Sequence, residues 1–461
     1  MDDILKLDAT VLAGRIADGT LTAEALMIAT LDHVDAVNPA LNAIVSRVDR
    51  ETLLAQARAA DAGPRKGPLH GLPIAVKDLA DVAGIPTSMG CAALAGMVPK
   101  TSDVMVQRMI DAGAIVIGKT NTPEFGLGSH TYNPVFGATC NAIDPSRSAG
   151  GSSGGAAVAL AARMTSIADG SDMMGSLRNP AGWNEIYGLR PTWGAVPSEP
   201  KGDTFLHQLS TGGPMARSPA DLALLLDVQA GRDPRQPHSL NHTPVAGRLD
   251  ADVSGRKIAW LGDWSGAYPM EAGVMDHSAA AVARLGAMGC VVEAVSATFK
   301  AADIWEAWIT LRSWSVSVGL GALYDNAGMR AKLKPEAIWE IERGRALTLA
   351  QVQAASVIRS RWFEKAASLF ETYDAFVLPT AQCYPFPVEW DWPREIAGVK
   401  MDTYHRWMEV VVPVSLIGLP CLAVPAGLGA NGLPMGLQIA GPRGADLALL
   451  QLGQAWHQQL T

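Results

Sequence analysis

The sequence lacks the features of several large classes of protein. No run of basic residues is longer than two, and 37 Lys and Arg residues stand against 45 Asp and Glu, a net charge of −8. Nucleic-acid-binding domains usually carry a basic surface, so we expect no nucleic-acid partner. The five cysteines are widely spaced and form no C-x-x-C pair. Neither a disulfide scaffold nor a zinc cluster is expected, and reduced cysteines are typical of a cytoplasmic protein.

Secretion signals and membrane spans are also missing from the pattern. The first residues are acidic and lack the charged and apolar segments of a secretory signal. Residues 410–431 carry no charge, but Pro413, Pro420 and Pro425 divide them into short pieces. Such pieces fit buried strands and turns better than a membrane helix. We therefore expect no membrane association and a cytoplasmic location.

What is present indicates an α/β fold. With 48% hydrophobic and 18% charged residues, the chain is able to bury a large core. Residues 8–62 have helical spacing, and apolar runs at 72–76 and 114–117 flank a helical segment at 102–112. This alternation predicts a large domain with a mostly mixed, twisted central β-sheet that is covered by helices on both faces.

We find no internal repeat or long linker, and we therefore treat residues 1–461 as one domain. N-terminal helices are expected over about 1–62 and a core over about 65–245. A helical region is inserted over about 275–370. The chain then returns to the core over about 375–461, and we expect strands as far as Ile439. Tryptophan residues at helical spacing usually belong to a hydrophobic core. An alternative is that some of them line an apolar, aromatic pocket; the candidates are Trp305, Trp308, Trp314, Trp339, Trp362, Trp390, Trp392 and Trp407.

One motif is misleading. Residues 113–120 match the phosphate-loop pattern G-x-x-x-x-G-K-T letter by letter. A phosphate loop needs flexible residues that turn their N–H groups inward, whereas Ala-Ile-Val-Ile favours a strand. Pro123 also fits poorly with a helix that begins at the lysine. We expect no nucleotide site here.

Three segments combine residue types that fit nucleophilic catalysis: 76–78, 150–155 and 172–178. A serine hydroxyl attacks a carbonyl only when a base removes its proton, and a buried, neutral lysine such as Lys77 can be that base. A second serine can relay the proton, and glycines permit the close backbone approach that this requires. Residues 150–154 also match G-x-S-x-G, the elbow of α/β-hydrolases, in which Ser152 would be an esterase nucleophile served by His405 or His457.

Order and spacing of several segments make the chain resemble the amidase signature family over nearly its whole length. The matching segments are 71–78, 118–125, 150–155, 172–180, 188–192, 213–217, 418–420 and 432–439. The resemblance implies that Ser176 is the nucleophile, that Ser152, preceded by a cis peptide bond, bridges it to a base, and that Lys77 is this base. No metal or organic cofactor is implied.

The resemblance also implies an oxyanion hole and its supports. The hole would consist of the backbone N–H groups of Met173, Met174, Gly175 and Ser176, with supporting roles for Ser153, Asp172 and Arg178. Met174 departs from the usual Gly-Gly before the nucleophile, and we expect its side chain either to line an acyl pocket or to enter the core. Its backbone would have to accept an angle that glycine adopts more readily.

The family acts on many amides, and its range includes a transamidation subunit that acts on charged tRNA. The acidic net charge disfavours that role. We expect a hydrolase that takes a small hydrophobic or aryl amide, or a carbamate (urethane), together with water. A non-hydrolytic protein on the same scaffold is a second class, although retention of Lys77, Ser152 and Ser176 weighs against it. A homodimer is left open.

Overall fold

The structure is a computed structural model that describes residues 4–206 and 209–460. Residues 1–3, on which the expectation of no secretory signal partly rests, lie outside the described residues. The helices expected over 8–62 are confirmed as η1 (Ile4–Lys6), α1 (Ala9–Ala17), α2 (Ala23–Leu41) and α3 (Arg50–Ala62). Helix α2 begins after Thr22, whose hydroxyl accepts a hydrogen bond from Ala25 N–H at 3.1 Å and thereby satisfies a free amide of the first turn.

A small sheet follows these helices. Strands β2 (Pro73–Lys77) and β3 (Ile115–Thr120) run parallel, α4 (Val104–Asp111) connects them, and β1 (Ile44–Val45) pairs with β3. The two apolar runs are therefore strands, as predicted. The phosphate-loop look-alike lies largely in β3, which is fully buried. It provides no loop around a phosphate group.

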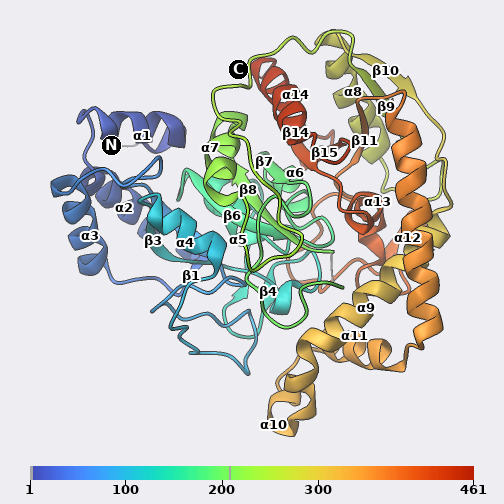
Figure 1. The fold of residues 1–461 in the computed structure, drawn as a ribbon, viewed down its shortest axis with the longest axis horizontal. Helices are drawn as coiled ribbons and strands as arrows, with labels where there is room; N and C mark the ends of the chain where they lie inside the picture. The colour runs from blue at the N-terminus through green and yellow to red at the C-terminus, as the bar shows by residue number, and fades with distance from the viewer. Residues whose placement is uncertain (1–3, 207–208, 461) are drawn as a thin grey trace.

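A second, mixed sheet of eight strands forms the centre of the domain (Figure 1). Strand β9 pairs in parallel with β10 and β11, and the other pairs are antiparallel. In spatial order the strands are β10 (Val291–Ala294), β9 (Lys257–Trp260), β11 (Ala375–Pro379), β15 (Pro434–Ala440), β14 (Cys421–Leu428), β7 (Tyr187–Arg190), β8 (Thr211–Ala216) and β6 (Ile167–Asp172).

Helices cover both faces of this sheet, as predicted. Along β11, Ala375 and Val377 pack into one core and Phe376 and Leu378 into the other, because successive side chains of a strand point to opposite faces. The first core is closed by α7 (Pro219–Gln229), α8 (Val274–Ala287) and α14 (Asp446–Gln458). Across the sheet lie α5 (Gly154–Ala161), α6 (Asn179–Trp183) and α13 (Val412–Leu416).

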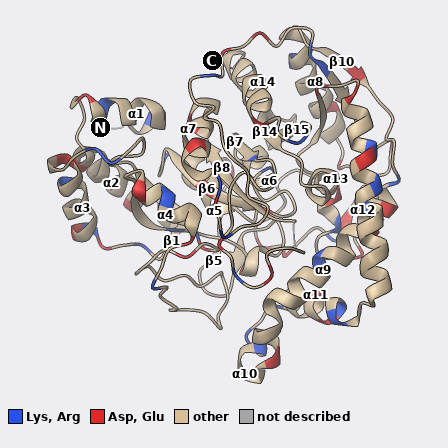
Figure 2. Cartoon of the chain, in the orientation of Figure 1, with Lys and Arg blue, Asp and Glu red and all other residues tan. Residues whose placement is uncertain are grey.

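The inserted helical region lies at the far end of the molecule from α1–α3 (Figure 1). It consists of α9 (Ala301–Asp325), α10 (Ala327–Arg330), α11 (Pro335–Ala346) and α12 (Leu349–Phe370). The expected span of about 275–370 also contains β10, an edge strand of the main sheet. Figure 2 marks basic and acidic residues on α12 and few charged residues on the central strands.

One expectation about the C-terminal part is wrong. Residues 375–439 are not strand-like throughout, because η3 (Arg406–Val411) and α13 interrupt them. Pro413 lies in the first turn of α13, where its missing N–H costs no helical hydrogen bond. Among residues 4–206 and 209–460, no helix is long and apolar enough to cross a membrane. The remaining short elements are η2 (Glu124–Gly126), β4 (Tyr132–Asn133), β5 (Gly137–Ala138), β12 (Glu395–Ile396) and β13 (Val399–Lys400).

Candidate active site

Lys77 lies at the carboxyl end of β2, where the apolar strand carries its amine into the interior. The side chain is 1% exposed. Its Nζ donates to Ser152 Oγ at 2.8 Å, to Ser153 Oγ at 2.9 Å and to Ser171 Oγ at 3.0 Å. The structure thus brings Lys77 together with two serines of the 150–155 loop. It also adds Ser171, for which the sequence predicted no role.

Burial lowers the pKa of Lys77 to about 7, although the charges of Asp169 and Asp172 oppose the shift. Removal from water disfavours the ammonium form, and hydroxyl partners compensate for that loss less than a carboxylate in contact would. Near neutral pH a large fraction of this amine is therefore unprotonated. In that form it is able to accept a proton.

The loop that carries Ser152 is shaped by its glycines. The peptide bond between Gly151 and Ser152 is cis, as the resemblance implies. Ser153 stands directly before α5, and a Cβ on Gly155, in the first turn, would collide with the backbone of Asn121. Only glycine permits this approach, which holds the loop against the end of β3.

The predicted nucleophile follows β6. Ser176 is 5% exposed and lines the same cavity as Ser152. Of the four N–H groups expected in the oxyanion hole, that of Gly175 donates to Asp172 Oδ1 at 2.8 Å. Those of Met173, Met174 and Ser176 form no hydrogen bond with any described residue. Three of the four predicted donors are therefore not engaged by the described residues, and the oxyanion hole itself stays a prediction.

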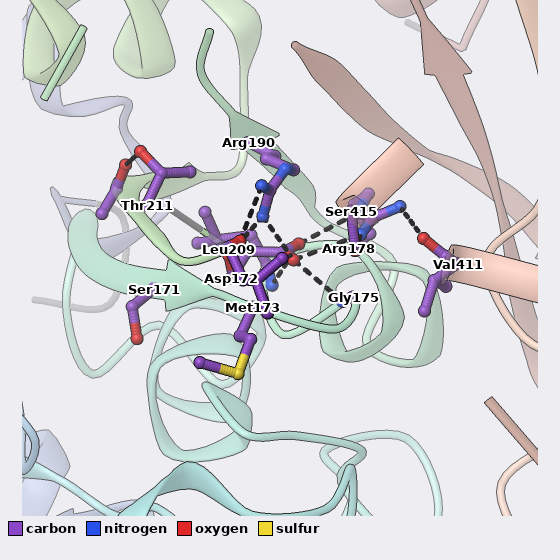
Figure 3. Close-up of polar contacts among 12 residues, drawn as sticks. Ser171, Asp172, Met173, Gly175, Arg178, Arg190, Leu209, Thr211, Val411 and Ser415 are labelled. Carbon is purple, nitrogen blue, oxygen red and sulfur yellow. Dashed lines mark hydrogen bonds and ion pairs between the residues drawn. The ribbon is translucent and has the colours of Figure 1, made fainter. Parts of the chain in front are cut away.

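Asp172 stabilises this turn by accepting hydrogen bonds from it and from two arginines (Figure 3). Its carboxylate accepts from Arg178 Nε at 2.9 Å and from Arg190 Nη1 at 3.1 Å, and all three side chains are fully buried. Burial alone would raise the pKa of Asp172, but the two guanidinium groups outweigh it and hold the pKa below its usual value. The sequence pointed to Asp172 and Arg178 but assigned Arg190 no role, although Arg190 lies in the matching segment 188–192, which was the signal that could have found it.

Arg178 also connects the nucleophile loop to the C-terminal part of the chain. Its Nη1 donates to the carbonyl oxygen of Val411 at 3.1 Å and to Gln438 Oε1 at 2.5 Å. Its Nη2 donates to Ser415 Oγ at 2.6 Å. Segments more than 230 residues away along the chain therefore hold this guanidinium in place.

The two methionines before the nucleophile have different surroundings. Met174 is 2% exposed and packs in the hydrophobic core, so its side chain does not line the pocket. Its φ is not positive, and Gly175 instead adopts the left-handed conformation with φ of 81°. The expected strain at residue 174 is thus avoided. Met173 lines the pocket, and its Sδ accepts from Arg312 Nη1 at 3.3 Å.

A cavity of about 210 Å³ opens in front of the serines. Its polar lining consists of serines, among them Ser152, Ser171 and Ser176, together with Ser210 and Ser315. Its other walls are mostly apolar, and α9 supplies one of them; these walls include Leu79, Phe125, Leu127, Met173, Val316, Gly319 and Leu320. The pocket thus combines a polar lining of serines with room for a small hydrophobic group.

The expected tryptophans do not line this pocket. Trp305, Trp308, Trp362 and Trp407 are buried in the hydrophobic core, and Trp390 is exposed. None of the tryptophans in the described part of the chain is among the lining residues. The core interpretation of their helical spacing is therefore confirmed, and the pocket wall comes from Phe125 and aliphatic side chains instead.

None of the histidines that the structure describes forms a hydrogen bond with Ser152, as the hydrolase-elbow alternative would require. His405 is fully buried and stacks on Tyr404, with ring centroids 4.4 Å apart, while Tyr187 and the His457 ring are joined by a 3.0 Å hydrogen bond. The base that contacts Ser152 is Lys77. Within residues 4–206 and 209–460, no group of three or more His, Cys, Asp or Glu residues is arranged to hold a metal ion.

Comparison with known proteins agrees with this geometry. Residues 25–450 match the family model described as Amidase. The chain is 33% identical over 454 residues to an acylamidase of Rhodococcus erythropolis, covering 96% of this chain and 94% of that protein. It is 34% identical over 490 residues to one of the subunits of the glutamyl-tRNA(Gln) amidotransferase of Acidothermus cellulolyticus, covering 99% and 94%.

Among solved structures, a bacterial aryl acylamidase of the amidase signature family superimposes with a TM-score of 0.92 at 27% identity, covering 98% of this chain and 96% of that one. The fold and the family that the sequence predicts are thereby confirmed. The chain belongs to the amidase family and is an amide-hydrolysing enzyme.

Proposed function

We propose that the protein hydrolyses small hydrophobic or aryl amides, and carbamates (urethanes) of similar size, through Lys77, Ser152 and Ser176. The observation that carries this proposal is the 2.8 Å hydrogen bond from Lys77 Nζ to Ser152 Oγ, in the lining of a pocket that Ser176 also lines. It joins a buried amine of lowered pKa to a hydroxyl that is able to relay a proton.

In the proposed first step, Ser176 Oγ attacks the carbonyl carbon of the amide. Its proton passes to Ser152, whose own proton moves to the neutral amine of Lys77. The carbonyl oxygen becomes an oxyanion and accepts hydrogen bonds from N–H groups of Met173, Met174 and Ser176.

In the second step, the intermediate collapses and its C–N bond breaks. The proton returns from Lys77 through Ser152 to the departing amine, and an ester on Ser176 remains. Water then attacks this ester and gives its proton through Ser152 to Lys77. When the ester bond breaks, that proton returns through Ser152 to Ser176 Oγ, and the acid is released. For a carbamate, the intermediate is a carbonate or carbamoyl ester according to which bond is cleaved.

The pocket supports the choice of substrate. Its walls from Phe125, Val316 and Leu320 favour an apolar group, and 210 Å³ accommodates a ring rather than a large polymer. The likeness to two acylamidases agrees with this choice. A tRNA-dependent transamidation subunit is the second candidate, favoured by the similarity to the amidotransferase of Acidothermus cellulolyticus. A homodimer and a cytoplasmic location stay predictions.

A fluorophosphonate probe tests the nucleophile. We expect intact-mass spectrometry to show one adduct, which peptide mapping places on Ser176 and which Ser176→Ala abolishes. Ser152→Ala is expected to slow labelling strongly. An adduct on Ser152 would overturn the proposed roles, and turnover by the isolated chain of glutamine alone, among a panel of amides, would favour transamidation.

Gly319 allows a test of the pocket. This residue lies in α9 at the pocket wall, and a Cβ there would meet nothing within 4 Å. Gly319→Leu is therefore expected to fold and to fill the pocket, lowering kcat/KM for an anilide about tenfold or more relative to acetamide. Gly286→Leu is the matched control, because Gly286 lies in α8 with equally open space and outside the pocket. Equal effects of both variants would contradict this view of the pocket.

A further inference from the structure

A second cavity, of about 240 Å³, is lined by Lys77 itself. Leu79, Ser171 and Ser210 line both cavities, so the two are neighbours. Glu199 and Ser198, at the rim of the second cavity, are partly accessible to solvent, and the cavity thus reaches the protein surface. The proposed base thus contacts Ser152 of the substrate pocket and also lines this neighbouring cavity, which we call the chamber.

Asp169 lines the inner end of this chamber and is 2% exposed. Its Oδ1 accepts a hydrogen bond from the backbone N–H of Lys77 at 3.0 Å. Its Oδ2 is buried and has no hydrogen-bond partner among the described residues. A carboxylate oxygen in this situation is costly, and such groups are found where their charge has a task.

The other acidic groups at the chamber are compensated by cations. At its rim, Asp103 receives a 2.8 Å contact from Lys201 Nζ, and Glu199 receives a 3.0 Å contact from Arg235 Nη1. Asp169 has no ion pair of this kind within the described part of the chain. Burial raises the pKa of Asp169 to about 6, and at neutral pH its charge acts on two buried amines, those of Lys119 and Lys77.

Groups on the neighbouring strands complete the environment of Lys77. Asp172, further along β6, is neutralised by Arg178 and Arg190. On β3, Lys119 faces Asp78, with Nζ and Oδ1 3.6 Å apart. Asp169 is thus the carboxylate beside Lys77 whose charge is not committed to a close ion pair of its own.

We propose that Asp169 is a positioning residue that sets the protonation state of Lys77 and that the chamber gives this pair its own access to solvent. The inference rests on the proposed role of Lys77 as base. A nearby carboxylate favours the ammonium form and so keeps the amine basic enough to take a proton from Ser152. Replacing Asp169 by asparagine would keep an oxygen that accepts the hydrogen bond from the Lys77 backbone N–H and would remove the negative charge of the carboxylate.

Asp169→Asn tests this through the pH dependence of kcat/KM. The acidic limb is expected to move to lower pH by about one unit, while the plateau above pH 8 changes by less than about threefold. At pH 7, where Asp169 with its pKa of about 6 is mostly charged, the variant would then retain about 1.8 times the fraction of its plateau rate that the wild type retains. Asp103→Asn, at the rim of the same chamber, is the control and is expected to leave the limb in place. An unmoved limb in Asp169→Asn would overturn the proposal.

Competitive acetylation with acetic anhydride gives a readout that does not need catalysis. The reactivity of Lys77 is followed by mass spectrometry from pH 5 to pH 10 in the wild type and in Asp169→Asn. We expect Lys77 to react with a midpoint that is lower in the variant by the same shift. A lowered midpoint in a chain without amidase activity would refute the proposed function and keep this coupling. Lys77 unreactive at every pH would refute access through the chamber.

Discussion

Two buried lysines on neighbouring strands allow a direct comparison. Lys77 ends β2 and Lys119 lies in β3, one residue out of register with it, since Val76 pairs with Lys119 and Lys77 with Thr120. Both side chains are almost completely inaccessible to water. Lys119 faces the carboxylate of Asp78, whereas the side-chain partners of Lys77 are hydroxyl groups.

Because their partners differ, we assign Lys119 a structural role and propose a catalytic role for Lys77. Burial lowers the pKa of both lysines, and at Lys119 the charge of Asp78 opposes this effect directly. Lys119 Nζ also donates to the carbonyl oxygen of Ala80 at 2.6 Å and to Thr87 Oγ1 at 2.9 Å, which joins β3 to the segment after β2. Lys119 thus joins two segments of the fold, whereas Lys77, whose side-chain partners are hydroxyl groups, is the residue that we propose as the base.

The largest effect that separates the two lysines is expected in catalysis. Lys77→Met removes the proton acceptor, and kcat/KM for an anilide is expected to fall by at least about 10³-fold. Lys119→Met changes activity only as far as it lowers the folded fraction. Steady-state kinetics normalised to the folded protein would measure both. Comparable losses of normalised activity would break the comparison.

In stability the order of the two is reversed. Lys119→Met leaves Asp78 buried without its cation, and we expect a loss of about 3–5 kcal/mol in the free energy of unfolding. Urea denaturation measures this loss. The double variant Lys119→Met/Asp78→Asn is expected to recover part of it, because the uncompensated charge is gone. An undiminished loss in the double variant would show that the ion pair is not the cause.

Lys77→Met is expected instead to stabilise the protein at pH 7, by roughly 2 kcal/mol after its lost hydrogen bonds are counted. The pKa of Lys77 is about 7 in the folded chain and near 10.5 for a free lysine, so the unfolded chain binds more protons between these values. Stability of the wild type therefore rises with pH across this window, and the advantage of the variant shrinks toward pH 10. Thermal unfolding at pH 7 and pH 9.5 checks the sign. An advantage that grows with pH would contradict it.

The smallest effect is the pH dependence of the wild type itself. Protonation of Lys77 below its pKa of about 7 removes the base, so kcat/KM at pH 6 is expected to be about tenfold below its plateau. Initial rates from pH 5 to pH 9 provide the profile. A flat profile down to pH 5 would place Lys77 outside the proton relay.

The sequence predicted the parts of the molecule that local pattern determines. The apolar runs became β2 and β3, the glycine–serine loop leads into α5, and Lys77 meets Ser152 across 75 residues, as the family motifs imply. Residues 406–416 were mistaken for strand because short apolar stretches fit either element. Their helical turns are stabilised by tertiary packing.

The site contains features that no local pattern signals. Arg190 reaches Asp172 only because β7 lies near β6, with β8 between them. The role that we propose for Asp169 depends on the cavity that this residue lines. The diversion of the Gly175 N–H to Asp172 is a matter of loop geometry. The wall that α9 supplies to the pocket depends on how an inserted helix packs, which spacing along the chain does not encode.

The contacts of Arg178 have a consequence for biosynthesis. Arg178 lies directly before α6 and two residues after the proposed nucleophile Ser176, yet three of its acceptors lie at Val411, Ser415 and Gln438. During translation, therefore, an unfinished chain that already contains Lys77, Ser152 and Ser176 lacks the groups that hold its nucleophile loop. Such long-range contacts form late and slowly. When about nine-tenths of the chain has left the ribosome, the site is therefore not yet formed. We expect premature stop codons late in the gene to abolish amidase activity as completely as early ones.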